Sequence, residues 1–269
     1  MPESDKSFDK EGLGNILLVA ISLCLVCAIV VSTAAVLLKP QQKLNQELDQ
    51  KQNILRAAGM LPEDSNVDPQ GRSVDELFSQ FTVRAVDLRT GRFTDEVDPA
   101  SYDPIKAAKD PARSMELSDT QDIATIGRRE NVSLVYLKES EGGVDKLVIP
   151  VRGYGLWGTL YGYLAIEGDL STVAGLGFYS QKETPGLGGE VDNPAWKAQW
   201  HGISLFDQSG KPAVRLVKSR SPEGSVAAGY EVDALSGATL TTRGVQDLVQ
   251  FWTGDLGFGL FLENLKSTT

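Results

Sequence analysis

The residues best suited to chemistry lie in one short segment near the C-terminal end, Asp-Ala-Leu-Ser-Gly-Ala-Thr-Leu-Thr-Thr at 233–242. Apolar residues then recur from Val245 to Trp252 with the spacing of an amphipathic helix. The free N–H groups and the positive dipole end at a helix start favour an anion, particularly phosphate. Small side chains would let that anion approach the backbone. The residues alone leave two interpretations open: a phosphate site, or an ordinary helix capped by Thr241 or Thr242.

The segment from Asp233 to Thr239 resembles the D-x-x-[S/T]-G-A-[S/T] signal at which a flavin transferase attaches FMN. In proteins with that signal, the last Ser or Thr hydroxyl is esterified to the flavin phosphate. The resemblance implies that Thr239 is the covalent anchor of one FMN per chain. It also implies that Ser236, Gly237, Ala238 and the following helix start hold the phosphodiester.

Further segments extend the resemblance over nearly the full length. GYGLWGTLYGYLAI at 153–166 and KETPGLGGEV at 182–191 are similar to glycine-rich segments of the FMN-binding domain, although Ser180-Gln181-Lys182 replaces a His-Gln-type lead. QNILRAAG at 52–59 and FWTGDLGFGLFLENL at 251–265 add matches outside that domain. The chain resembles the C subunits of sodium-translocating NADH:quinone oxidoreductases. This implies one N-terminal helix and a large extracytoplasmic flavin domain.

Four residues of the glycine-rich segments are candidates for contacts with the flavin ring. Glu183 and Thr184 could hydrogen-bond its polar edge, or they could belong to a strand-end turn set by Pro185. Trp157 and Leu187 could flank the isoalloxazine, although Trp157 could equally be a core residue. Both interpretations stay open at the level of sequence.

An uncharged run of 23 residues, 16–38, predicts a membrane anchor. At about 1.5 Å per residue it spans roughly 34 Å, enough for a bilayer core of about 30 Å, and it exceeds the 7–15 apolar residues of a signal peptide. Cys24 and Cys27 lie on one face of this run, as packing residues or as ligands shared with a partner. Flanking lysines weakly favour a cytoplasmic C-terminal domain. The resemblance instead implies a single-pass protein of the bacterial inner membrane with its large domain on the periplasmic side.

Composition excludes several classes of function. Lys and Arg number 26 against 36 Asp and Glu, a net charge of −10, which disfavours binding to nucleic acid. His201 is the single histidine, and there are two cysteines. These counts argue against a histidine cluster, a Cys₄ zinc site, an iron–sulfur cluster within the chain and a disulfide scaffold. We therefore expect no metal site.

The pattern predicts an α+β protein: a single N-terminal transmembrane helix, then a soluble FMN-binding domain with a largely antiparallel sheet and flanking helices. Glycines punctuating short apolar runs indicate strands with tight turns. The expected parts are a short cytoplasmic tail at 1–14, a transmembrane helix at 15–38 and a juxtamembrane helix at 39–60, for which Gly59 is a plausible C-cap. The N-terminal part of the soluble domain is expected at 61–130 and the FMN-binding domain at 131–269. Expected elements are a helix leading into a strand over 74–86, strands at 131–137, 146–151 and 173–180, and a hairpin of 202–206 with 213–217.

The resemblance implies an electron-carrying subunit of an NADH:ubiquinone reductase, relaying single electrons through the FMN in support of sodium export and not catalytic alone. Expected partners are the other subunits of the membrane complex, a flavin transferase during maturation and the lipid bilayer. One alternative is the G subunit of the related Rnf-type ferredoxin:NAD oxidoreductase, which tends to be shorter between anchor and flavin domain. Others are a free-standing flavin reductase and a membrane-anchored assembly module without cofactor.

Overall fold

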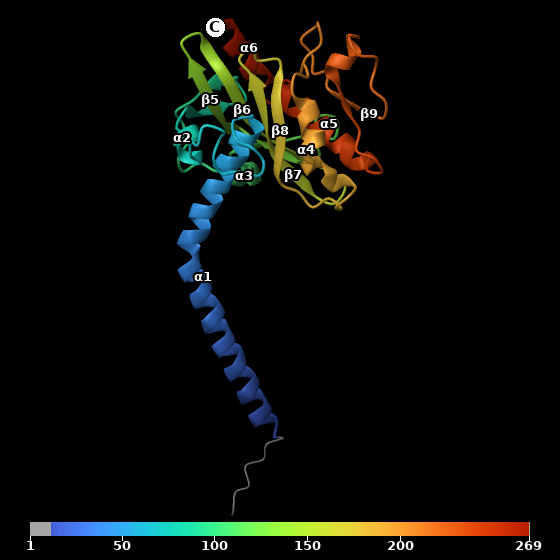
Figure 1. Cartoon of the computed structure of the whole chain (residues 1–269). Coiled ribbons are helices and arrows are strands. Elements are labelled where there is room, and N and C mark those ends of the chain that lie inside the picture. The colour runs from blue at the N-terminus through green and yellow to red at the C-terminus, as the bar shows by residue number, and fades with distance from the viewer. Residues whose placement is uncertain (1–11, 269) are drawn as a thin grey trace, which may run out of the picture. The chain divides into compact units, whose positions relative to one another are not determined.

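The computed structural model describes residues 12–268, so the predicted tail of 1–14 lies almost wholly outside the described residues. The chain falls into two compact units that divide between Asp49 and Gln50 (Figure 1). The second unit contains the sheet and the C-terminal helices, and all the residues predicted to contact FMN belong to it.

The first helix, α1 (Leu13–Ala57), is 45 residues long and continues through Pro40. The two helices expected at 15–38 and 39–60 are therefore one continuous helix. The boundary between a membrane-spanning part and a juxtamembrane part stays a prediction. Among the described residues, α1 is the one helix long and apolar enough to cross a membrane by length and composition. Its most apolar window has a mean hydropathy of 2.9 and no buried residue.

The C-terminal turns of α1 belong to the second unit. Ile54 and Leu55 are completely buried there. Gly59 has φ of +68°, and the N–H of Met60 donates to the Leu55 carbonyl at 2.8 Å. A left-handed residue just past the last turn is a common way to end a helix, and glycine adopts it without a Cβ penalty. The predicted cap at Gly59 is confirmed.

A six-stranded sheet forms the centre of the second unit, with strand order β2-β1-β5-β6-β7-β8 and every neighbouring pair antiparallel. Figure 1 shows β5 to β8 side by side. The strands are β1 (Phe81–Asp87), β2 (Arg92–Phe93), β5 (Val132–Ser140), β6 (Gly143–Tyr154), β7 (Thr159–Glu167) and β8 (Val173–Ser180). The predicted α+β class, its antiparallel sheet and the three strands expected around 131–180 are confirmed.

Shorter elements surround this sheet. The two-stranded sheets are β3 (Ser114–Glu116) with β4 (Arg128–Glu130), and β9 (Arg215–Val217) with β10 (Glu231–Asp233). The helices are α2 (Val74–Phe78), α3 (Pro104–Lys109), α4 (Pro194–Lys197), α5 (Thr239–Thr253) and α6 (Gly259–Thr268), with 3-10 turns η1 (Gly188–Asp192), η2 (Ala198–Trp200) and η3 (Ala227–Tyr230). The expected passage from helix to strand over 74–86 is confirmed by α2 and β1.

The two faces of the sheet pack into separate cores because successive side chains of a strand point to opposite faces. Leu147 and Ile149 of β6 belong to a large cluster that includes the apolar stripe of α5 and Phe261 of α6. Val148, between them, belongs to a second cluster with the end of α1 and with α2. The sheet thus holds α5 against one face, and the C-terminal end of α1 packs with α2 against the other.

The hairpin expected between 202–206 and 213–217 is wrong in its second half. Phe206 and Pro212 form an isolated antiparallel bridge around a turn capped by the Asp207 carboxylate, which accepts from the Ser209 N–H at 2.8 Å. Beyond this bridge, β9 pairs in parallel with β10 instead of returning along 202–206. Leu216 in β9 is also bound through its N–H to the Gln246 side chain of α5 at 3.0 Å. Contacts distant in sequence therefore decide this pairing.

Candidate functional site

The 233–242 segment connects β10 to α5 through a tight turn. The main chain of Asp233 is held by two side chains: its carbonyl accepts from the Trp196 indole at 2.8 Å, and its N–H donates to Gln199 at 3.1 Å. Gly237 then adopts φ of +72°. A Cβ built there would lie 2.9 Å from the Leu187 Cδ2. Glycine is therefore favoured at 237 by the backbone conformation, whereas the Leu187 side chain, which is exposed, could move away from an added Cβ.

The start of α5 carries no cap of its own. Its N-cap residue is Ala238, which makes no side-chain cap hydrogen bond, and the first turn holds no acidic residue. Thr241 and Thr242 lie inside the helix, so the alternative in which one of them caps it is wrong. The first carboxylate along α5 is Asp247, and burial raises the pKa of that group. The positive end of this helix dipole is thus left without a compensating charge from α5 itself.

The threonines of the first turn differ in what their hydroxyls do. The Thr241 hydroxyl is buried and donates to the Glu183 carboxylate. The Thr242 hydroxyl accepts from the Leu235 N–H at 3.0 Å. Thr239 is exposed, and its hydroxyl bonds to no described residue. Of these three hydroxyls, that of Thr239 is the one free to react at the helix entrance.

Glu183 joins three segments beneath this entrance. Its side chain is buried, with Oε1 accepting from the Leu156 N–H and the Trp157 N–H, each at 3.0 Å. Its Oε2 accepts from the Thr241 hydroxyl. Hydrogen bonds to a charged acceptor are stronger than neutral ones and offset the desolvation of a buried carboxylate. The predicted site residue Glu183 therefore fastens the turn after β6 and the first turn of α5 to its own loop.

Two glycines give this carboxylate room. A Cβ at Gly188 would lie 2.5 Å from the Thr241 Oγ1 and 2.8 Å from the Glu183 Oε2. A Cβ at Gly155 would lie 2.6 Å from the Glu183 Oε1. All three distances are shorter than real carbon–oxygen contacts, so any side chain at either position must displace the hydrogen bond between Thr241 and Glu183 or the Glu183 carboxylate itself. The Glu183 carboxylate therefore explains why glycines occupy positions 155 and 188.

A second pair of glycines sets α5 close to β6. A Cβ at Gly244 would lie 2.2 Å from the Tyr154 carbonyl oxygen, and one at Gly153 would lie 2.5 Å from the Leu248 Cβ. The Trp252 indole, two turns beyond Gly244, donates to the Arg152 carbonyl at 2.7 Å. Helix and strand therefore meet with backbone nearly touching, which positions the start of α5 beside the turn between β6 and β7.

Large apolar side chains stay exposed around Thr239. The relative exposure of Trp157 is 63% and that of Leu187 is 44%, so the interpretation of Trp157 as a core residue is wrong. Leu156 at 39% and Leu240 at 56% are exposed as well. We call Leu156, Trp157, Leu187 and Leu240 the apolar rim. It comes from the same loops that Glu183 and Gly237 hold together.

Thr184 has a backbone role in the turn that carries Leu187. Its carbonyl accepts from the Leu187 N–H at 3.1 Å and the Gly189 N–H at 2.9 Å, and Gly186 has φ of +75°. The turn at Pro185, which was the alternative interpretation of this segment, is therefore present. The Thr184 residue is nonetheless exposed, and its hydroxyl bonds to no described residue.

Sequence reasoning missed Thr241, Gly188 and Leu240 as parts of this site. The repeated threonines of 239–242 were a signal, because hydroxyls inside a helix turn often bond to something other than water. Nothing in the local pattern connected Thr241 to Glu183, which lies 58 positions earlier in the chain.

The FMN-binding domain family matches residues 155–254, which include the turn after β6, the Glu183 loop and α5. The C subunit of the Na(+)-translocating NADH-quinone reductase of Pseudomonas aeruginosa is 51% identical over 259 residues, covering 96% of this chain and 98% of the relative. The protein of the same name from Vibrio vulnificus is 49% identical over 249 residues, covering 92% and 93%.

Solved structures agree. The crystal structure of Shewanella oneidensis NqrC has a TM-score of 0.73 and 35% identity, covering 83% of this chain and 99% of that one. The crystal structure of the C subunit of the Na(+)-translocating NADH-quinone reductase of Parabacteroides distasonis has a TM-score of 0.60 and 29% identity, covering 84% and 96%. The similarity thus extends well beyond the flavin domain and includes residues before it.

Proposed function

This chain belongs to the family of C subunits of Na(+)-translocating NADH-quinone reductases, and we propose that it carries one FMN through a phosphoester at Thr239 and relays single electrons within that complex. It is a subunit of a multisubunit oxidoreductase with an FMN-binding domain, and one N-terminal helix suited to anchor it. The near full-length similarity, which extends over 39–130, favours this family over the Rnf-type G subunit.

The observation that carries the proposal is the contrast among the threonine hydroxyls at the start of α5. Thr241 and Thr242 are buried and engaged, whereas Thr239 is exposed beside an uncapped helix end. A phosphodiester keeps one negative charge, which free N–H groups at a helix start stabilise. The residues therefore fit a phosphate esterified to Thr239, with Ser236, Gly237 and Ala238 forming the turn around it.

The apolar rim fits the ring of the same cofactor. Exposed aromatic and branched side chains gathered in one place mark a surface that something covers. Trp157 and Leu187 would flank the isoalloxazine, and the free hydroxyl of Thr184 would bond its polar edge. Glu183 would not contact the ring but would hold the turn of Trp157 and the first turn of α5 in place through its hydrogen bonds. FMN supplies the redox chemistry, while these residues position it and exclude water.

A covalent tether suits a cofactor on an outer membrane face. A dissociated FMN would be lost by dilution, whereas a linked one keeps a high local concentration whatever its affinity. We place the chain in the bacterial inner membrane with the second unit on the periplasmic side, where a flavin transferase would modify it. No charged residue interrupts 16–38, so the sodium path would run through other subunits.

The test is expression of the full chain together with a flavin transferase. Denaturing electrophoresis under ultraviolet light should show a fluorescent band that Thr239→Ala abolishes and that Thr239→Ser, which keeps a hydroxyl at this position, retains. Mass spectrometry of the peptide around 231–243 should place the added FMN on Thr239. A wild-type band without fluorescence and with unmodified mass would support the assembly module. Turnover of a small substrate by the isolated chain would support the flavin reductase.

Orientation has a separate test. Asp119 is exposed, and the native cysteines Cys24 and Cys27 both lie in the apolar run. In a background with these two replaced by alanine, Asp119→Cys should react in intact cells with a thiol reagent that crosses the outer but not the inner membrane. Labelling only after lysis would place the domain in the cytoplasm.

A further inference from the structure

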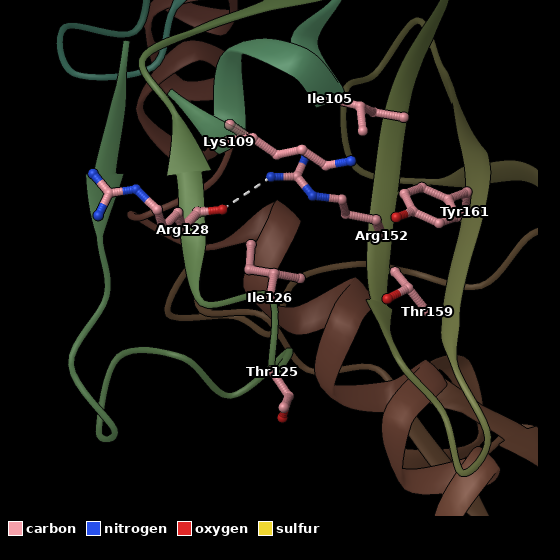
Figure 2. Close-up of a pocket in the computed structure, with 9 residues that line it drawn as sticks. Ile105, Lys109, Thr125, Ile126, Arg128, Arg152, Thr159 and Tyr161 are labelled. Atoms are coloured by element: carbon pink, nitrogen blue, oxygen red, sulfur yellow. Dashed lines mark hydrogen bonds between the residues drawn. The ribbon is translucent and has the colours of Figure 1, made fainter. Parts of the chain in front are cut away.

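A cavity of about 210 Å³ lies beside the β6–β7 hairpin and is not part of the site above (Figure 2). Its walls come from α3, the loop before β4, and strands β6 and β7. Ile105 and Ile126 supply apolar wall, whereas Lys109, Arg152 and Tyr161 supply polar groups. Three separate parts of the chain therefore converge on one hollow.

Arg152 is the buried cation of this cavity. The residue is 8% exposed, and one guanidinium nitrogen, Nη2, donates to the Glu130 carboxylate at 2.6 Å and to the Arg128 carbonyl at 3.1 Å. Its Nε and Nη1 donate to no described residue, although neither is sealed from solvent. Figure 2 shows the Arg128 side chain turned away, so Arg152 alone presents a guanidinium here. Two directional donors are thus left for a ligand.

Lys109 brings a second positive charge to the same hollow. Its side chain runs above the Arg152 guanidinium in Figure 2, and it forms no ion pair with any residue in 12–268. The hydroxyls of Thr159 and Tyr161, on the far wall, also bond to no described residue. Glu130 offsets one of the two cations and leaves the other uncompensated. In a chain with a net charge of −10, this cavity is a local positive site suited to an anion.

Size and shape restrict the occupant. Small-molecule pockets usually measure about 300–1,000 Å³, so a cavity of about 210 Å³ is too small for a nucleotide or a flavin. A carboxylate side chain fits, because guanidinium donors match the two oxygens of a carboxylate. The apolar walls at Ile105 and Ile126 would cover its methylene groups.

The position of the cavity relates it to the hairpin that carries Trp157. Thr159 pairs with Tyr154, and the Tyr154 N–H donates to the Ala124 carbonyl at 2.8 Å, next to the cavity wall at Ile126. Leu160 packs in the core with α5, so its neighbours on β7 point to the opposite face. A ligand in the cavity would therefore contact the hairpin through Thr159 and Tyr161, and it would meet Arg152, whose guanidinium lies 5.0 Å from the centroid of the Trp252 ring of α5.

We propose that this cavity receives an Asp or Glu side chain of a partner subunit of the complex, with Lys109 and Arg152 as its cationic contacts. The source is a partner subunit because the chain belongs to a multisubunit reductase. Docking there would hold the β6–β7 hairpin, which carries Trp157, against that subunit. The proposal rests on membership of the complex and does not depend on how FMN is attached.

The direct test is zero-length cross-linking of the intact complex with a water-soluble carbodiimide. The reagent activates a carboxylate, the Lys109 amine displaces the activating group as a urea, and an amide forms between the two chains. Mass spectrometry should find a Lys109 peptide joined to an Asp or Glu peptide of another subunit. Lys109→Arg should keep the positive charge but lose this cross-link, because a guanidinium does not react in this way.

Lys106 provides a matched control on the same helix. It is exposed and pairs with Asp103 at 3.1 Å, away from the cavity. Lys109→Glu sets two negative charges face to face, so quinone reduction by the complex at low salt should fall about tenfold or more. Lys106→Glu should change it less than twofold. In-gel flavin fluorescence should persist in both variants, which separates this result from loss of the cofactor.

The proposal is wrong if Lys109 stays unlinked, or links only within its own chain, while other lysines of the complex cross-link to partners. Wild-type turnover and subunit retention in Lys109→Glu would also overturn it. A tenfold loss that Lys106→Glu reproduces would assign the effect to general charge instead of to the cavity.

Discussion

A hydroxyl is bound to a carboxylate at the start of both α2 and α5, but only in α2 does the carboxylate belong to the helix itself. In α2 the Ser73 hydroxyl accepts from the Glu76 N–H, and the Glu76 carboxylate accepts from the Ser73 N–H at 2.7 Å. In α5 the Thr241 hydroxyl donates to Glu183, which comes from another loop. We call Ser73 and Glu76 the local pair, and Thr241 and Glu183 the distant pair. The local pair caps the N–H groups at the start of α2, whereas the distant pair leaves the start of α5 without a side-chain cap.

The difference shows how a helix end becomes available to a ligand. The free N–H groups of any helix start need acceptors, and a capping box supplies them from the helix itself. The start of α5 has no side-chain cap, and the Glu183 carboxylate instead binds the turn after β6 and the first turn of α5. The remaining N–H groups can then serve a phosphate, provided the loops keep their arrangement.

The largest effect is expected from Glu183→Ala, because the distant pair serves three segments at once. It removes the acceptor of two backbone N–H groups and one buried hydroxyl, and should lower the free energy of unfolding by about 3 kcal/mol. Urea unfolding of the full chain in detergent, followed by tryptophan fluorescence, measures this loss. Glu183→Gln keeps an acceptor and should lose clearly less. Equal losses in the two variants would contradict the role assigned to the hydrogen bonds.

Gly188→Ala should come next, because the new Cβ must enter the space between Thr241 and Glu183. Overpacking of this kind costs about 1–3 kcal/mol, and the yield of fluorescent, flavin-loaded chain should fall with it. Gly177→Ala in β8 is the matched control, since a Cβ there has nothing within 4 Å. Unchanged stability of Gly188→Ala would show that the bridge can shift at no cost.

A smaller effect is expected at the local pair. Ser73→Ala removes the cap of α2 and should lower the free energy of unfolding by about 1 kcal/mol. Because α2 packs against the face opposite α5, the yield of flavin-loaded chain should stay at the wild-type level. A drop in that yield would mean that the two helix ends are coupled.

The smallest effect is a pH dependence confined to α2. The backbone N–H of Ser73, and then its side chain, hold the pKa of the exposed Glu76 carboxyl below its ordinary value. The box is therefore fully formed above the unfolded-state pKa of Glu76 and is lost as pH falls through the lower folded-state pKa. NMR titration of the Glu76 and Leu77 amide signals should follow this loss. In Glu76→Gln the same signals should no longer titrate in that range.

Much of the fold was predictable because its signals are local. Composition or periodicity within a few residues was enough to predict four features. These are the apolar run of 16–38, the glycine cap at Gly59, the strand at 173–180 and the helix after Thr239. The pairing of β9 was not predictable, because Arg215–Val217 meets Glu231–Asp233 in parallel across a long connection. Strand partners depend on which surfaces meet, and short segments contain no such information.

By itself, the sequence determined that a small-residue turn enters an amphipathic helix with several hydroxyls at its start. Only the tertiary structure decided which hydroxyl is free. Glu183 reaches Thr241, and the backbone of Leu235 reaches Thr242, only after the sheet has brought α5 against β6. Dihedral angles and amphipathicity follow from neighbouring residues, whereas burial and hydrogen-bond partners follow from chain segments that meet when the core forms.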